Sequence, residues 1–268
     1  MTTINNFDRT CSVCGKTTSQ PVLGSTCSLD YSDLDTRPAP LQRETMNLWV
    51  FECPHCGYVS HNIEKELELS PDFLKTDEYL TCDNMEFKSE LSKKFYRQYL
   101  IGNEKKDYET AFFALLHCTW ACDDAEDELA VKIRKMALEI LPKIDMNKDL
   151  MLIKADLLRR ACQFDELIRQ FSDVSLSDEL YDKIIKFQLE LARKKRRYLL
   201  HSRGCFKRIT SPFYFISQLP LFSCLYHTTH YPRDCNISTI FLPQKQISAQ
   251  HPNPQNGILL SQAIPQII

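Results

Sequence analysis

Two short stretches near the N-terminus decide how that part of the chain folds: Cys11-Ser12-Val13-Cys14-Gly15 and Cys53-Pro54-His55-Cys56-Gly57. Each is a C-x-x-C-G knuckle, in which two intervening residues let one tight turn point both sulfur atoms at one metal ion. The trailing glycine accepts a positive φ, and backbone N–H groups in such a turn can donate to the thiolates. Four thiolates close a tetrahedral zinc shell. The sequence therefore predicts a zinc ribbon with a structural Zn²⁺ bound by Cys11, Cys14, Cys53 and Cys56.

Other uses of these cysteines fit the sequence less well. A single C-x-x-C shares its spacing with redox dithiols, and disulfides need an oxidising compartment. Residues 1–10 have neither the basic start nor the apolar run of a signal peptide, and no run is apolar for long enough to span a bilayer. We therefore expect a cytoplasmic protein with reduced thiols and no membrane association. Cys118 and Cys122 lie four positions apart on a predicted helix, where they read as buried residues rather than as a redox pair.

Composition separates the end of the chain from the rest. Residues 1–198 carry 34 acidic and 28 basic side chains, whereas residues 199–268 carry one acid, five bases and seven of the 13 prolines. Prolines at this density interrupt helices and strands. We predict that residues 199–268 form a disordered or aberrant tail. The abrupt change near residues 193–200 favours a shifted reading frame, and the alternative is a genuine extension under little constraint.

Residues 61–198 are predicted to be helical. Gly102 is the only glycine between Tyr58 and Tyr198. Apolar residues recur there at helical spacing in six stripes, starting near residues 87, 108, 129, 150, 164 and 180. Short turns between them predict antiparallel helical hairpins. The turn at Ala161 to Phe164 resembles that of a tetratricopeptide hairpin, although Cys162 stands where glycine is usual. A plain helical bundle fits the pattern as well as a tetratricopeptide-like array.

The predicted fold is thus mainly α, with a zinc-ribbon module over residues 1–60 and a helical domain over 61–198. Residues 47–52 are expected to form a strand that enters the second knuckle, and residues 58–60 a strand that leaves it. Residues 28–38 are turn-rich and lack periodicity.

The knuckles and the chain between them resemble one known family. The stretches 33–38, 43–50 and 52–59, together with His117-Cys118-Thr119-Trp120-Ala121-Cys122-Asp123-Asp124, resemble the bacterial family called domain of unknown function 2225. The resemblance covers about residues 8–195. From about Arg196 onward, the sequence departs from the family's pattern. It implies an uncharacterised bacterial cytosolic protein with a tetratricopeptide-like helical region, four metal ligands and no assigned reaction.

Several charged residues are candidates for chemistry. Asp33, Asp35 and Arg37 could bind a ligand or perform acid–base chemistry, but such a cluster more often caps turns and makes local ion pairs. Positions 123–128 hold five acids, which could dock a basic partner or, more simply, form a solvated loop and an acidic helix start.

Three histidines are weaker candidates. His55 lies inside the second knuckle, where the cysteines have the better ligand spacing, so we expect it to be exposed. His61 could approach the metal only if a cysteine were displaced. His117 falls on a helical stripe, where a core or edge position is more common than a ligand role.

The sequence predicts no catalytic residues and no cofactor other than the metal. It contains no phosphate-binding glycine loop, dinucleotide fingerprint, zinc-protease motif or nucleophile elbow. The favoured function is a non-enzymatic module that binds a protein or peptide. The first alternative is a nucleic-acid-associated ribbon protein, because Arg193 to Arg197 form a basic run. The second is a thiol- or zinc-dependent enzyme, although a catalytic zinc keeps an open position that a fourth cysteine would close.

Overall fold

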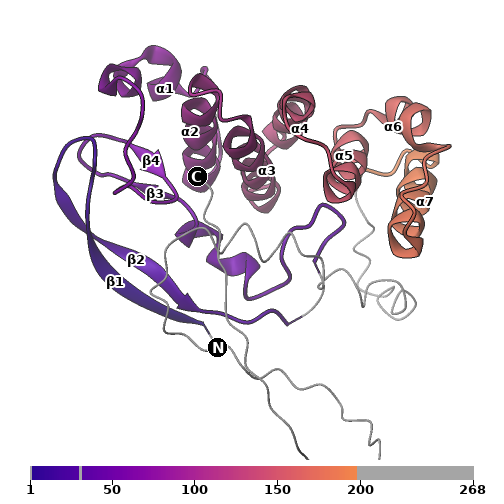
Figure 1. The fold of residues 1–268 in the computed structure, drawn as a ribbon, viewed down its shortest axis with the longest axis horizontal. Helices are drawn as coiled ribbons and strands as arrows, with labels where there is room; N and C mark the ends of the chain where they lie inside the picture. The colour runs from indigo at the N-terminus through magenta and orange to yellow at the C-terminus, as the bar shows by residue number, and fades with distance from the viewer. Residues whose placement is uncertain (1, 30–31, 198–268) are drawn as a thin grey trace, which may run out of the picture. The chain divides into compact units, whose positions relative to one another are not determined.

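The computed structural model of the chain describes residues 2–29 and 32–197. Its first feature is an antiparallel hairpin of β1 (Thr3–Thr10) and β2 (Thr17–Ser25), in which Thr10 pairs with Thr17 across the first knuckle (Figure 1). β-Branched residues recur in both strands and favour extended backbone. Most of the hairpin is exposed. Its main structural role is therefore to position the first knuckle.

The second knuckle lies between two short strands, β3 (Phe51–Glu52) and β4 (Val59–Ser60). A 3-10 helix, η1 (Arg43–Leu48), precedes β3. The predicted strand over residues 47–52 is therefore wrong for its first part, while the strand after the knuckle is confirmed at residues 59 and 60. One cause is the indole of Trp49, which donates to the Thr45 hydroxyl over 3.0 Å and so favours a helical turn between them.

After β4 the described chain is mainly helical, and each stripe predicted from the sequence falls largely in a helix, although the first stripe begins three residues before α2. The elements are η2 (Pro71–Lys75), α1 (Asp77–Thr81), α2 (Glu90–Glu104), α3 (Tyr108–Asp124), α4 (Leu129–Ile140), η3 (Leu141–Lys143), α5 (Lys148–Arg160), α6 (Phe164–Phe171) and α7 (Glu179–Arg193). Neighbouring helices from α2 to α5 pack against one another, and α5 contacts both α6 and α7. The described chain is mainly α with a small strand region, as predicted.

Four helices end in the same way. α2, α3, α5 and α7 are each followed by a residue with positive φ: Lys106, Glu126, Cys162 and Lys195. The next backbone N–H donates over 2.8–2.9 Å to a carbonyl in the last helical turn, which is the Schellman arrangement. Cys162 has a φ of 60°, so it occupies the left-handed position that glycine usually takes. The ends of α3, α5 and α7 lie 36 and 33 residues apart, close to the length of a two-helix repeat unit.

Two apolar clusters form the interior of the described chain. The larger one includes the knuckle cysteines Cys11 and Cys53 together with residues of α2, α3, α4 and α5, so the knuckles and these helices share one apolar core. The smaller one consists of residues from α5, α6, α7 and the chain between them, together with Leu34. None of the helices in the described ranges is both long and apolar enough to cross a membrane. The predicted tail, residues 199–268, lies outside the described residues.

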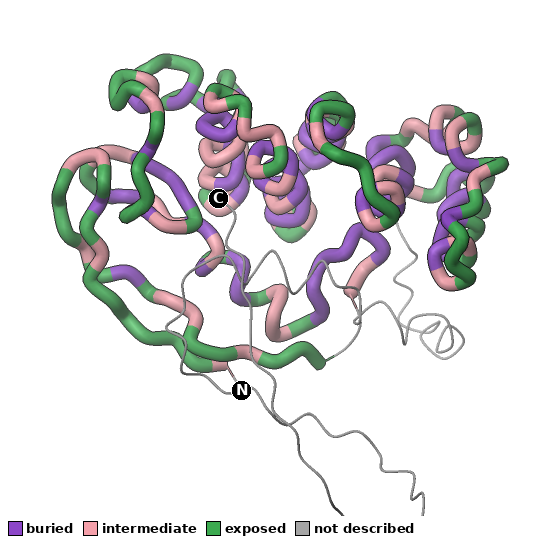
Figure 2. Tube along the Cα trace, viewed as in Figure 1, coloured by how far each residue is buried: buried purple, intermediate pink, exposed green. Residues whose placement is uncertain are grey.

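The chain between the knuckles is irregular, but part of it is buried. Residues 34–39 are buried without interruption, and Figure 2 shows this stretch as a continuous buried trace leading back to η1. The sequence indicated a turn-rich segment here, which is confirmed for the described residues, but gave no sign of its burial.

Candidate metal centre

The two knuckles have the same backbone geometry. In the first, the N–H of Gly15 donates to the Cys11 carbonyl over 2.8 Å; in the second, the N–H of Gly57 donates to the Cys53 carbonyl over 2.9 Å. The glycines have φ values of 69° and 73°, in the left-handed region that residues with a Cβ seldom adopt. Each turn therefore brings its second cysteine back toward the first, as the C-x-x-C-G pattern predicts.

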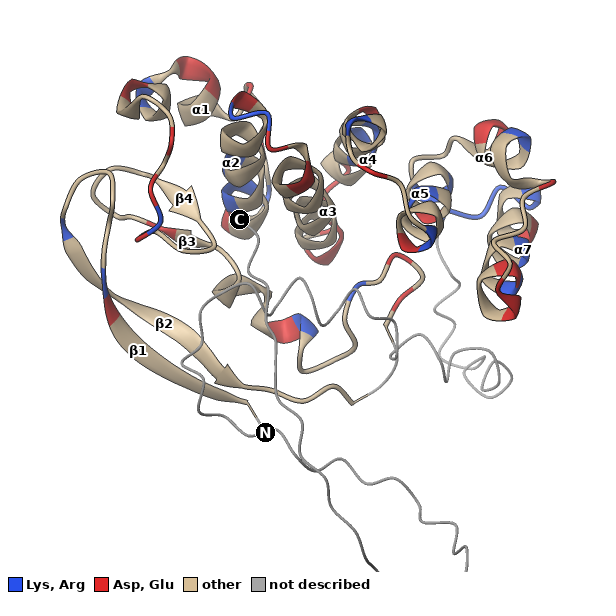
Figure 3. Ribbon diagram, in the orientation of Figure 1, with Lys and Arg blue, Asp and Glu red and all other residues tan. Residues whose placement is uncertain are grey.

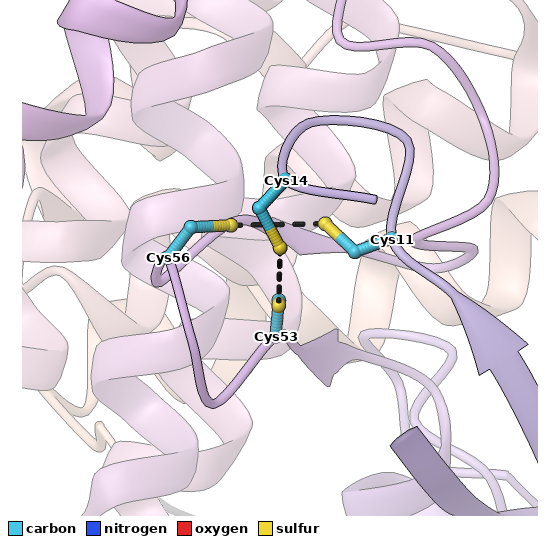
Figure 4. A group of neighbouring side chains, drawn as sticks. All are labelled: Cys11, Cys14, Cys53 and Cys56. Atoms are coloured by element: carbon cyan, nitrogen blue, oxygen red, sulfur yellow. Dashed lines mark hydrogen bonds between the residues drawn. The ribbon is translucent and has the colours of Figure 1, made fainter. Parts of the chain in front are cut away.

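The four predicted cysteines converge on one point. Their sulfur atoms all lie within 4.8 Å of one another, and Figure 4 shows them facing a common centre. The Sγ of Cys11 lies 3.7 Å from that of Cys56, and the Sγ of Cys14 lies 3.6 Å from that of Cys53. A tetrahedral site with Zn–S bonds of about 2.3 Å separates its sulfur atoms by about 3.8 Å. A disulfide would need about 2.05 Å. The four sulfur atoms therefore have the spacing of a metal shell.

The surroundings of the sulfur atoms combine burial with hydrogen-bond donors. Cys11 and Cys53 are fully buried, and Cys14 and Cys56 are half-buried. Burial raises the pKa of the Cys11 and Cys56 thiols. Burial acts the same way on Cys53, but N–H groups of His55 and Cys56 and the Cys14 thiol outweigh it, and the pKa of Cys53 is lowered. Metal binding at this site must therefore displace protons from thiols.

The knuckles are tied to the chain that follows them. The Ser12 N–H donates to the Ile63 carbonyl over 2.9 Å. The Tyr79 hydroxyl donates to the Gly57 carbonyl over 2.6 Å, and Arg97 of α2 pairs with Glu52 of β3 at 2.8 Å. These contacts tie the first knuckle to the chain at Ile63 and the second knuckle to α1 and α2, so the metal-ligand geometry does not depend on the small ribbon alone.

The remaining cysteines and the nearby histidines stand apart from this cluster. Cys27, His55 and His61 are exposed, and none of them belongs to the metal-competent group found among the described residues. Cys118 and Cys122 are buried free thiols on α3. The Cys118 Sγ donates to the Ser92 carbonyl over 3.2 Å, and burial raises the pKa of the Cys118 thiol.

Asp33, Asp35 and Arg37 have partners of two kinds. Asp33 pairs locally with Arg43 at 2.9 Å, as the sequence predicts. For the other two, the expectation of local ion pairs is wrong. Asp35 accepts from the Trp120 indole over 2.8 Å and from Arg160 over 2.7 Å, while Arg37 pairs with Asp124.

The acidic run at positions 123–128 is only partly a solvated loop. Asp123 forms ion pairs with Arg134 and Arg160, and Asp127 is buried, where it accepts from the backbone N–H groups of Lys88 and Leu129 over 2.9 and 3.0 Å. The prediction of a solvated loop is therefore wrong at these two positions, whereas Asp124, Glu126 and Glu128 are exposed. The missed partners of Asp123 are arginines on α4 and α5, which spacing along the sequence does not identify.

His117 lies inside an aromatic cluster. Its ring centroid is 5.3 Å from that of Trp49, 5.2 Å from that of Phe95 and 5.0 Å from that of Trp120. Burial lowers the pKa of His117 to about 4. The ring therefore packs as a neutral group at neutral pH, in agreement with the core or edge position predicted from the sequence.

The described chain thus brings together one set of four cysteines that could hold a metal ion. Comparison with protein-family models, with curated proteins and with solved structures finds no match to this chain.

Proposed function

We propose that this protein is a non-enzymatic binding module, in which a structural Zn²⁺ fixes the N-terminal ribbon and the helical region binds a protein or peptide. The observation that carries the metal assignment is the convergence of the four cysteine sulfur atoms, which all lie within 4.8 Å of one another. Cysteine-only tetrahedral shells are typical of structural zinc, whereas catalytic zinc keeps one position for water or substrate. The four-sulfur set therefore favours a structural role over a hydrolytic one.

The binding role is supported by the helical region. Its helix ends recur at a repeat-like interval, and stacked two-helix units commonly present extended binding surfaces. The resemblance to domain of unknown function 2225 rests on the knuckle motifs and implies a tetratricopeptide-like helical region after them.

The test uses the full chain, loaded with zinc and tagged, to isolate cross-linked partners from bacterial cells. A supporting result is a discrete protein that then binds the purified chain saturably and without steep dependence on salt. Saturable binding of DNA or RNA that weakens steeply with salt would favour the nucleic-acid alternative instead. Turnover of a small substrate, lost on a point substitution that leaves the fold intact, would contradict the proposal.

A further inference from the structure

The irregular chain between the knuckles enters the helical region as a compact turn. The Asp33 N–H donates to the Arg37 carbonyl and the Thr36 N–H donates to the Asp33 carbonyl, both over 2.9 Å. We call residues 33–39 the plug. Irregular segments usually run over a protein surface, because buried backbone needs polar partners. The burial of residues 34–39 therefore marks a specific docking contact.

An apolar side chain at the tip of the turn anchors the plug. Leu34 is 4% exposed and belongs to the smaller apolar cluster, alongside Leu152, Ala155 and Leu158 of α5. The other fully buried members of that cluster in the described chain come from α5 onward. Leu34 thus enters a core that is otherwise built by the last three described helices.

Polar groups that follow Leu34 define the chemistry of the contact. Asp35 is 1% exposed and its Oδ2 accepts from Trp120 of α3 and Arg160 of α5. Arg37, 5% exposed, pairs with Asp124 at the end of α3. Figure 3 shows charged residues on the irregular segment where it approaches α5. The surface formed by α3 and α5 therefore recognises an apolar group beside a carboxylate, with a cation two positions further on.

The docked plug also contains unfavourable features. Thr36, a β-branched residue, has a φ of 68°, in the left-handed region. Such conformations persist only where surrounding contacts hold them, and they gather at switch regions. The buried Nε of Arg37 has no acceptor among the described residues. A ligand that made the same three contacts without this strain would bind the surface more favourably than the plug does.

We propose that α3 and α5 form a binding site for a peptide or turn that presents an apolar residue, an adjacent carboxylate and a cation two residues later, and that the plug fills this site in cis. The proposal rests on the proposed function as a binding module and names its surface and ligand chemistry. The plug is tethered, so its effective concentration at the site is high, on the order of millimolar for a short flexible link. Partner binding requires displacement of the plug.

Hydrogen exchange on the full zinc-loaded chain tests whether the plug opens independently. We expect the Thr36 amide to exchange at least tenfold faster than the amides of Leu115 to Thr119 in the middle of α3. Exchange of the plug only at the slow rate of α3 would mean that it opens with global unfolding, and that result would overturn the proposal without any variant.

A binding experiment tests the ligand chemistry. The receptor is the full chain with Leu34→Ala and Asp35→Ala, which weakens the plug but retains Trp120, Asp124 and Arg160. The probe is a fluorescein-labelled peptide of residues 32–40. We expect the probe to bind this receptor at least tenfold more tightly than it binds the unsubstituted chain. Equal affinities, or no saturable binding, would overturn the proposal.

A charge swap identifies the site. Adding Asp124→Lys to the receptor is expected to lower its affinity for the probe by about fivefold, the contribution of one partly exposed ion pair. Arg37→Glu in the probe is expected to restore that affinity. If these two substitutions do not change the affinity for the probe, the probe binds elsewhere and the proposed site on α3 and α5 is wrong. If an authentic partner binds the unsubstituted chain and the plug-weakened chain equally, this inference fails while the proposed binding function stands. If the probe binds but no cellular partner exists, the proposed function fails instead.

Discussion

The guanidinium of Arg160 donates to the carboxylate of Asp35 over 2.7 Å and thereby joins the irregular chain between the knuckles to the end of α5. Arg160 also pairs with Asp123 and, at 3.9 Å, with Asp156. Burial acts to lower the pKa of Arg160, but these three carboxylates outweigh it and raise that pKa. Arg160 therefore stays ionised in an interior where an unpartnered charge is costly.

Removal of Asp35 should destabilise the protein strongly. Asp35→Ala leaves Arg160 and the Trp120 indole without their shared acceptor, so we expect a loss of about 3 kcal/mol in the free energy of unfolding. Asp33→Ala is the matched control, because the Asp33 side chain is 42% exposed and its ion pair with Arg43 should contribute less than about 1 kcal/mol. Urea denaturation measures both. Equal effects of the two substitutions would contradict the assigned network.

His117 should make stability depend on pH. Its pKa is about 4 in the folded protein against 6.5 for the free side chain, so the unfolded chain binds the extra proton between these values. The free energy of unfolding should therefore decrease as pH falls from 6.5 toward 4, with no contribution from His117 above that window. His117→Gln should flatten this decrease. Protonation of metal ligands contributes equally to both proteins, so identical slopes would refute the account of His117.

Much of the fold follows from local patterns. The knuckles were predictable because two cysteines and a glycine specify one turn, and the helices because apolar residues repeat at helical spacing. The plug was not predictable, because the burial of Leu34, Asp35 and Arg37 depends on partners from α3 and α5 that lie far along the chain. The error at residues 47–50 has a local origin, since an apolar run fits either a strand or a 3-10 turn, and the hydrogen bond from Trp49 to the Thr45 hydroxyl favours the turn.

The four metal ligands of the site could be predicted from the sequence, but the contacts that surround the knuckles could not. Sequence spacing selects Cys11, Cys14, Cys53 and Cys56. It does not reveal that Tyr79 and Arg97 fasten the second knuckle to the helical region, because those contacts require the chain to fold back.

Glycine at position 162 should stabilise the turn after α5. Cys162 is exposed and has a φ of 60°, a conformation that costs a residue with a Cβ about 1 kcal/mol relative to glycine. Cys162→Gly should therefore raise the free energy of unfolding by up to about 1 kcal/mol. Ala161→Gly, one residue earlier at negative φ, is the matched control and should lower it by a similar amount. Thermal unfolding compares the two, and destabilisation by Cys162→Gly would contradict the turn assignment.

Gly102 should not tolerate alanine despite its helical position. A Cβ there would lie 3.0 Å from the backbone nitrogen of Ala111 and 3.2 Å from its Cα. Helix propensity favours alanine by up to about 1 kcal/mol, but overpacking against backbone costs about 1–3 kcal/mol. We expect Gly102→Ala to lower the free energy of unfolding by about 1 kcal/mol. Asn103→Ala, on the same helix, should leave stability unchanged or raise it, and a gain in stability from Gly102→Ala would show that α2 and α3 are less closely packed.

Metal content tests the central claim most directly. Elemental analysis of the purified full chain should give one zinc per chain, and X-ray absorption should show four sulfur neighbours at about 2.3 Å. Cys53→Ser with Cys56→Ser should abolish this zinc, whereas Cys27→Ser should retain it, because Cys27 is exposed and outside the cluster. A zinc content near zero in the unsubstituted chain, or full zinc in the Cys53→Ser, Cys56→Ser chain, would contradict the account.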